Sequence, residues 1–184
     1  MGPGTLIKIC KSKKGKDVII RTVKRSDLEG LQKFANDLID EDTFIMLSGK
    51  KITFAEEKKY LDGVFQQIKK KQKIYLVATV DGQIAGTTDL RRQERRENHV
   101  GEMGISLAPE FRGEGIGTVL FKTLINQARK MGLKLLYLHC FETNKVARAM
   151  YEKLGFKYAG VVPGMIFFKN KYIGQITYYL PLVI

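Results

Sequence analysis

The most informative stretch of this 184-residue sequence is Pro109-Glu110-Phe111-Arg112-Gly113-Glu114-Gly115-Ile116-Gly117-Thr118. Three glycines at alternate positions join a strand pattern to an amphipathic helix, and glycine lets a backbone approach a ligand without a Cβ in the way. The free amides and the dipole at the start of that helix favour anions, and Arg112 can add a guanidinium for a pyrophosphate. The spacing differs from that of dinucleotide folds, and no Lys-Ser/Thr pair follows as in a P-loop. The stretch therefore predicts a phosphate-binding turn, against the alternative of glycines that serve packing alone.

A second informative segment runs from Asn144 to Phe156. Asn144 lies where a strand pattern ends and a helix begins, a position typical of an N-cap. Tyr151 lies two turns further along the same helical face, and Gly155 ends the helix. Taken alone, a tyrosine on such a helix is more often a core residue than a catalyst, and the residues themselves leave both roles open.

The elements around these two segments predict a mixed α/β domain. Two capping boxes, which begin at Ser26 and Thr53, predict helices over 27–40 and through Ile68. Asp81-Gly82 predicts a tight hairpin turn. Apolar periodicity predicts further helices at 115–131 and 145–154, and strands at 18–23, 74–80, 83–90, 100–108, 134–141, 157–168 and 172–180.

The net charge of +13 comes from 32 Lys and Arg against 19 Asp and Glu, and it is concentrated near the start of the chain. Residues 1–25 hold eight basic residues and one acidic residue, so more than half of the excess lies there. We expect residues 1–17 to form a basic N-terminal arm, either loose or as an exposed first strand, and residues 18–184 to form a single domain. Such a run is usually a solvated surface, and the alternative is an arm that touches nucleic acid or an acidic substrate.

Several classes of protein are disfavoured by the composition. No apolar run approaches the ~20 residues that cross a bilayer, and the Lys-rich first 15 residues lack the apolar region of a signal peptide. Two cysteines, Cys10 and Cys140, cannot form a disulfide framework, and no Cys/His spacing predicts a metal site. We therefore expect a cytoplasmic protein with no membrane partner and no metal.

Taken together, the two segments resemble the GNAT superfamily of acetyl-CoA-dependent N-acetyltransferases. The residues that carry the resemblance are Arg112-x-x-Gly115-x-Gly117 and Asn144-x-x-Ala147-x-x-x-Tyr151-x-Lys153-x-Gly155-Phe156. It implies the GNAT acyl-CoA N-acyltransferase fold, an α/β fold with a mixed sheet of about seven strands, splayed in the middle, and about four helices. The sequences at 20–28 and 172–180 are also similar to the branch that contains ribosomal-protein and other protein N-acetyltransferases, although small-amine acetyltransferases share the same frame.

The resemblance also implies where acetyl-CoA binds as co-substrate. Two strands splay apart, and pantetheine lies between them against the backbone of Ile105, Ser106 and Leu107. The pyrophosphate lies on amides of the turn, contributed by Arg112, Gly113, Glu114, Gly115, Ile116, Gly117 and Thr118. Asn144 and Ala147, at the start of the following helix, flank the pantetheine arm.

For the chemistry, the resemblance implies direct attack of a neutral amine on the thioester in a ternary complex. Tyr151 matches the general acid of the family. Glu102, a carboxylate in an apolar strand, is the candidate general base through a water, and its alternative role is a salt-bridged strand residue. His99 and His139 are alternative bases. Cys140 is most simply a small buried apolar residue.

The acceptor is the least determined part. In this fold its groove lies around residues 40–51 and 160–174, where Glu41, Asp42, Tyr60, Met165 and Phe168 are candidates. A protein N-terminus or lysine is the favoured acceptor, and a polyamine, amino sugar or amino acid is the alternative. A non-catalytic basic module bound to nucleic acid or ribosomes is a third hypothesis, which makes nucleic acid a secondary partner. We expect a monomer or a homodimer.

Overall fold

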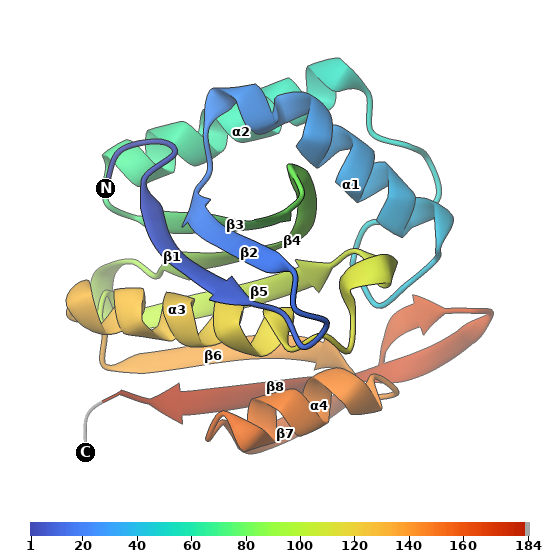
Figure 1. The fold of residues 1–184 in the computed structure, drawn as a ribbon. Helices are drawn as coiled ribbons and strands as arrows, with labels where there is room; N and C mark the ends of the chain where they lie inside the picture. Colours follow the sequence, from blue (N-terminus) through green and yellow to red (C-terminus); the bar gives the residue numbers. More distant parts are fainter. Residues whose placement is uncertain (183–184) are drawn as a thin grey trace.

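A computed structural model describes residues 1–182 of the chain. Their eight strands form one mixed sheet in the order β1-β2-β3-β4-β5-β6-β8-β7 (Figure 1). The strands are β1 (Leu6–Lys11), β2 (Asp17–Thr22), β3 (Lys73–Val80), β4 (Gln83–Arg92), β5 (Val100–Leu107), β6 (Leu135–Phe141), β7 (Lys157–Phe168) and β8 (Lys171–Pro181). The helices are α1 (Leu28–Asp40), α2 (Phe54–Lys69), α3 (Ile116–Lys130) and α4 (Lys145–Lys153).

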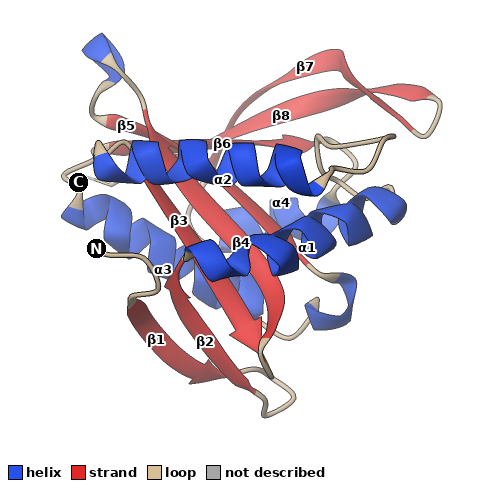
Figure 2. Cartoon of the chain, turned by 90° about the horizontal axis from the view of Figure 1, so that it is seen from above, coloured by secondary structure: helices blue, strands red, loops and turns tan. Residues whose placement is uncertain are grey.

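The helices cover both faces of the sheet. Figure 2 shows α1 and α2 on one face and α3 and α4 on the other. Successive side chains of a strand point to opposite faces, so alternate residues of β3 enter two cores. Val77 packs in the cluster under α1 and α2, whereas Leu76 and Ala78 pack in the cluster that includes α3. This two-sided burial explains why β3 is apolar throughout, as a central strand of a covered sheet requires.

The middle of the sheet is splayed. β5 and β6 run parallel and pair only from Val100 to Glu102 and from Leu135 to Tyr137. Beyond that point β5 keeps its pairing with β4 up to Leu107, and β6 keeps its pairing with β8 up to Phe141. The second half of β5 therefore has a neighbouring strand on one side only, which confirms the expected gap.

The basic N-terminal segment forms the edge of the sheet. Its residues 6–11 form β1, which pairs antiparallel with β2 at the edge of the sheet. This strand raises the count to eight from the expected seven or so. The pairing of β1 with β2 contains a bulge between Leu6 and Lys8, so β1 lacks the regular alternation of apolar and polar residues by which a strand is predicted. The lysines of β1 are typical of an edge strand that resists pairing with further strands. Of the two alternatives for this segment, the exposed first strand is the one observed.

The start of α1 corrects an expectation. The capping box at Ser26 does not form. Asp27 instead accepts a hydrogen bond from the backbone amide of Lys24 at 2.9 Å and pairs with both terminal nitrogens of Arg21 at 2.7 Å. The buried carboxylate of Asp27 thereby satisfies a cation and an amide at once, which a serine hydroxyl cannot do.

The start of α2 is as expected. The Thr53 hydroxyl accepts a hydrogen bond from the amide of Glu56, and the Glu56 carboxylate accepts one from the amide of Thr53. These bonds also lower the pKa of Glu56. Both amides belong to the set that a helix leaves without partners at its first turn.

Replacing Thr53 by alanine is expected to lower the free energy of unfolding by about 1 kcal/mol, because an N-cap bond is lost. Urea unfolding followed by circular dichroism measures the change. Ser48→Ala, in the exposed loop before α2, is the control and should leave stability unchanged. Equal midpoints for the two variants would show that the cap contributes nothing.

No helix among residues 1–182 is both long and apolar enough to cross a membrane.

Candidate active site

The turn between β5 and α3 has the geometry of an anion site. Gly113 and Gly115 have φ angles of +75° and +83°, the left-handed region that favours glycine. Across the described part of the chain, no group accepts a hydrogen bond from the amides of residues 113–118. Six successive amides at the start of a 15-residue helix are thus available to an anionic ligand.

Gly117 lets this turn approach the end of β5 closely. A Cβ at Gly117 would lie 2.8 Å from Cδ1 of Leu107 and 3.5 Å from Sδ of Met150. The same end of β5 is packed against β4 at Gly86, where a Cβ would overlap the Leu107 side chain. Two glycines therefore fix the position of the backbone next to the gap.

Arg112 has protein partners in this arrangement. Its guanidinium forms a two-pronged pair with Glu41, one prong at 2.6 Å, and donates to the Leu107 carbonyl at 3.0 and 3.1 Å. Its amide donates to the carbonyl of Pro109 at 3.2 Å. Arg112 thus ties the end of α1 to the end of β5, and the expected contact with a pyrophosphate stays a prediction.

The gap itself exposes the backbone of Ile105, Ser106 and Leu107 on the side away from β4. Because β5 and β6 are parallel, their carboxyl ends lie at the same edge of the sheet, and α3 and α4 both begin there. Asn144 caps α4, since its side chain accepts a hydrogen bond from the amide of Ala147 at 3.1 Å. The observed role of Asn144 is the capping one, and its contact with pantetheine remains a prediction.

Tyr151, on α4, lies in the core on the face of the sheet that α3 and α4 cover. Its ring is 6% exposed and packs against Phe121, Phe156 and Tyr178, with ring centroids 5.6 to 6.0 Å apart. Burial, with the neighbouring Cys140, raises the pKa of Tyr151 well above its usual value near 10. The hydroxyl therefore stays protonated at neutral pH, and its role as general acid stays a prediction.

Cys140 is buried in the same core cluster. Burial raises the pKa of its thiol to about 11, so the thiolate needed for nucleophilic attack is scarce at neutral pH. This environment fits the expected role as a small buried apolar residue.

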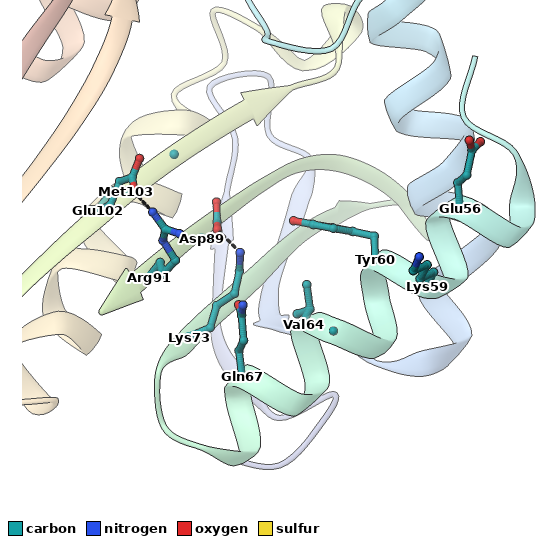
Figure 3. Close-up of a pocket in the computed structure, with 12 residues that line it drawn as sticks. Glu56, Lys59, Tyr60, Val64, Gln67, Lys73, Asp89, Arg91, Glu102 and Met103 are labelled. Carbon is teal, nitrogen blue, oxygen red and sulfur yellow. Dashed lines mark hydrogen bonds and ion pairs between the residues drawn. The ribbon is translucent and has the colours of Figure 1, made fainter. Parts of the chain in front are cut away.

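Glu102 lies at the point where β5 and β6 part. Its carboxylate pairs with Arg91 on the neighbouring strand at 2.7 Å and is 31% exposed. It also lines a cavity of about 690 Å³ under α2, shown in Figure 3. Glu102 is therefore salt-bridged, as in the alternative role considered for it, and its role as general base stays a prediction.

The two histidines lie at different ends of the strands. His139 follows Tyr137 by two residues on β6, so both share a face with Glu102, the cross-strand partner of Tyr137. The His139 ring is exposed and its Nδ1 lies 3.0 Å from the Thr177 hydroxyl. His99 precedes β5, where its carbonyl accepts from the amide of Lys134, and it is thus far along the strand from residues 105–107. Geometry favours His139 over His99 as the alternative base.

The cavity contains a second ion pair. Lys73 at the start of β3 lies 2.6 Å from Asp89 on β4, and Tyr60 of α2 stacks near the Lys73 ammonium, 5.9 Å from centroid to nitrogen. Burial raises the pKa of Tyr60. Acidic, basic and aromatic groups therefore converge on one space (Figure 3), a combination typical of a small-molecule or side-chain pocket.

Of the five residues expected at the acceptor groove, Tyr60 is the one that lines this cavity. Glu41 pairs with Arg112. Phe168 packs against Phe44 and Phe141, and so joins β7 to the loop after α1. Asp42 and Met165 are exposed nearby. Phe44, Phe141 and Phe168 therefore form an aromatic cluster in the region where the sequence placed the acceptor groove.

Sequence reasoning did not single out Lys73, Asp89 or Arg91. Asp89 and Arg91 are two residues apart on one strand and therefore share a face. This pair of charges on one face of β4 was the signal in the sequence that could have identified them. Their ion-pair partners, Lys73 on β3 and Glu102 on β5, are brought to them only by the folding of the sheet.

Comparison with known proteins gives a consistent result. Residues 36–156, more than half of the chain, match the model of the acetyltransferase (GNAT) family. An uncharacterized N-acetyltransferase of Methanocaldococcus jannaschii is 30% identical over 122 residues, which are 61% of this chain and 52% of that protein. The chain spans about half the length of the curated relatives it matches.

Solved structures share the fold. An acetyltransferase of the GNAT family from Streptococcus pneumoniae superposes with a TM-score of 0.80 at 25% identity, covering 90% of this chain and 99% of that one. The ribosomal L7/L12 α-N-protein acetyltransferase RimL, in complex with coenzyme A, superposes with a TM-score of 0.81 at 15% identity, covering 96% and 97%.

Proposed function

Because this chain belongs to the GNAT family of acetyltransferases, we propose that it transfers an acetyl group from acetyl-CoA to a primary amine. The observation that carries the proposal is the gap between β5 and β6, next to the turn that begins α3. Six amides of this turn find no acceptor among residues 1–182. A strand edge and an anion site side by side suit a ligand with an amide-bearing arm and phosphates.

The residues present fit acetyl-CoA, which supplies an activated acetyl thioester when bound. The backbone of Ile105, Ser106 and Leu107 would hold the pantetheine arm. The amides of residues 113–118 would hold the pyrophosphate, with Arg112, Asn144 and Ala147 at the two ends of the site. Free amides near Leu107 would also polarise the thioester carbonyl, as in an oxyanion hole.

Two proton transfers remain for side chains. The attacking amine forms the new C–N bond and loses a proton, while the C–S bond breaks and the departing sulfur gains one. Tyr151, protonated and on the face of the sheet that α3 and α4 cover, is proposed to donate to the sulfur. Glu102, on the opposite face and next to the cavity, is proposed to accept the proton of the amine through a water.

The proposed acceptor is a protein N-terminus or lysine side chain that enters the cavity beside Glu102. Three carboxylates, Glu56, Asp89 and Glu102, line this cavity and can contact an ammonium group. Three basic side chains line it as well, of which Lys73 pairs with Asp89 and Arg91 with Glu102. A volume of about 690 Å³ also suits a complete small amine, which keeps a polyamine, amino sugar or amino acid as the second candidate.

The release of coenzyme A thiol in the presence of different acceptors tests this proposal. The acceptors are a peptide with a free N-terminus and no lysine, an N-acetylated peptide with one lysine, and a polyamine. Stimulation by one of the three identifies the acceptor class. No stimulation by any amine, together with no binding of acetyl-CoA, would overturn the proposal.

The exchange Glu102→Gln is expected to lower kcat by about 100-fold, the lower end of the contribution of a general base. Glu29→Gln, an exposed neutralisation on α1, is the control and should leave kcat unchanged. An unchanged kcat in Glu102→Gln would assign the base to His139 instead.

A further inference from the structure

The tip of the β1–β2 hairpin lies against the Gly-rich turn that begins α3 (Figure 1). The amide of Lys13 donates to the carbonyl of Glu114 at 3.0 Å, and the ammonium of Lys14 lies 3.0 Å from the Glu114 carboxylate. The hairpin tip is closed by its own bond from the amide of Ser12 to the carbonyl of Lys16 at 2.8 Å. A segment about 100 residues earlier in the sequence therefore forms one wall of this turn.

The charges at this contact are not balanced. Glu114 is buried, and hydrogen bonds from Lys14 and then Ser12 lower its pKa, so it is ionised and its charge is matched by Lys14. Lys16 lies 3.5 Å from Asp81. Lys13 forms no ion pair with any residue from 1 to 182. Lys13 is thus the surplus cation beside the turn.

The Lys13 side chain is also directed along the turn rather than away from it. Its Cγ and Cε lie 3.7 and 3.8 Å from the place that a Cβ of Gly115 would occupy. A lysine that lays its aliphatic stem over a glycine keeps its ammonium group close to that backbone. The amides next to it, from residues 113 to 118, are the ones that have no acceptor in the described part of the protein.

We propose that Lys13 binds a phosphate group of coenzyme A together with these amides, so that the β1–β2 hairpin is part of the cofactor site. The inference rests on the proposed function, since it needs acetyl-CoA at the turn. An ammonium is a point charge suited to phosphate. Glu114 is a positioning residue here, because it holds the hairpin against the turn through Lys14 and the Lys13 amide.

Binding of three ligands to the full chain tests the inference: acetyl-CoA, its 3′-dephospho form, and S-acetylpantetheine, which carries no pyrophosphate. Lys13→Ala is expected to weaken acetyl-CoA binding by about fivefold to tenfold, the range of one charge-assisted contact at a partly exposed site. Lys8→Ala is the matched control, because it removes the same charge from an exposed position on β1 of the same hairpin. Lys13→Arg should restore most of the affinity.

Each outcome has a distinct meaning. A loss for acetyl-CoA alone assigns Lys13 to the 3′-phosphate, and an equal loss for the dephospho form assigns it to the pyrophosphate; both support the inference. Equal affinities in Lys13→Ala and Lys8→Ala would overturn it and leave the proposed function intact, as would an equal loss for S-acetylpantetheine, which has no phosphate at the turn. Failure of the unaltered chain to bind acetyl-CoA would overturn the proposed function itself.

Discussion

Replacing Gly115 by valine is expected to weaken acetyl-CoA binding by at least 100-fold. Gly115 has a φ of +83°, which costs a β-branched residue roughly 1–2 kcal/mol, so the turn will relax toward negative φ. That relaxation turns the neighbouring amides away from their common direction. The loss of two charge-assisted bonds at about 1.5–3 kcal/mol each corresponds to a factor of ~100 or more.

A matched control separates this loss from general destabilisation. Gly132 follows the other end of α3 with a φ of +76°, and no atom lies within 4 Å of the place where its Cβ would be. Gly132→Val therefore introduces the same backbone strain without touching the turn. Calorimetric titration with acetyl-CoA, alongside thermal unfolding, should show similar losses of stability for the two variants and a loss of affinity in Gly115→Val alone. Equal affinities would show that the glycines serve packing.

The parts of the fold that local residues determine could be predicted from the sequence. The Thr53 capping box, the Asp81-Gly82 turn and the apolar run of β3 all use neighbours within a few residues, and each forms as expected. The Ser26 capping box does not form, because Asp27, just before α1, pairs with Arg21 on β2. A local sequence pattern cannot show that the folded chain brings a stronger hydrogen-bond partner to one of its side chains.

The same distinction applies to the candidate site. Its anion turn could be predicted from three glycines at alternate positions in a short stretch. The gap could be predicted from the resemblance in the order of strands and helices. Arg112, by contrast, looks like a free guanidinium until packing brings Glu41 to it, 71 residues earlier in the chain. The basic charge of the first 25 residues looked like a solvated arm, whereas β-sheet pairing places part of it at the turn. The partner of each charged side chain therefore depends on contacts between residues far apart in the sequence.

Removal of the Tyr151 hydroxyl is expected to have the second large effect. Tyr151→Phe should lower kcat by about 100-fold or more while affinity for acetyl-CoA stays within about twofold, since a general acid contributes some 10²–10⁴-fold and acts on the leaving sulfur. Because burial raises the pKa of Tyr151 above 10, its hydroxyl keeps the proton at alkaline pH. Wild-type kcat should therefore show no fall that depends on Tyr151 between pH 7 and 10.

Tyr178 provides the control for this exchange. Its ring centroid lies 5.9 Å from that of Tyr151, but its hydroxyl already donates to Glu152 at 2.8 Å and so has a structural partner. Tyr178→Phe removes the same atom from the same core and should cost about 1 kcal/mol of stability with kcat nearly unchanged. Steady-state kinetics measures kcat for both variants. An equal loss of kcat in the two would show that the Tyr151 hydroxyl contributes through packing alone. A loss confined to Tyr151→Phe, with unchanged acetyl-CoA affinity, can arise only if the hydroxyl takes part in the chemical step.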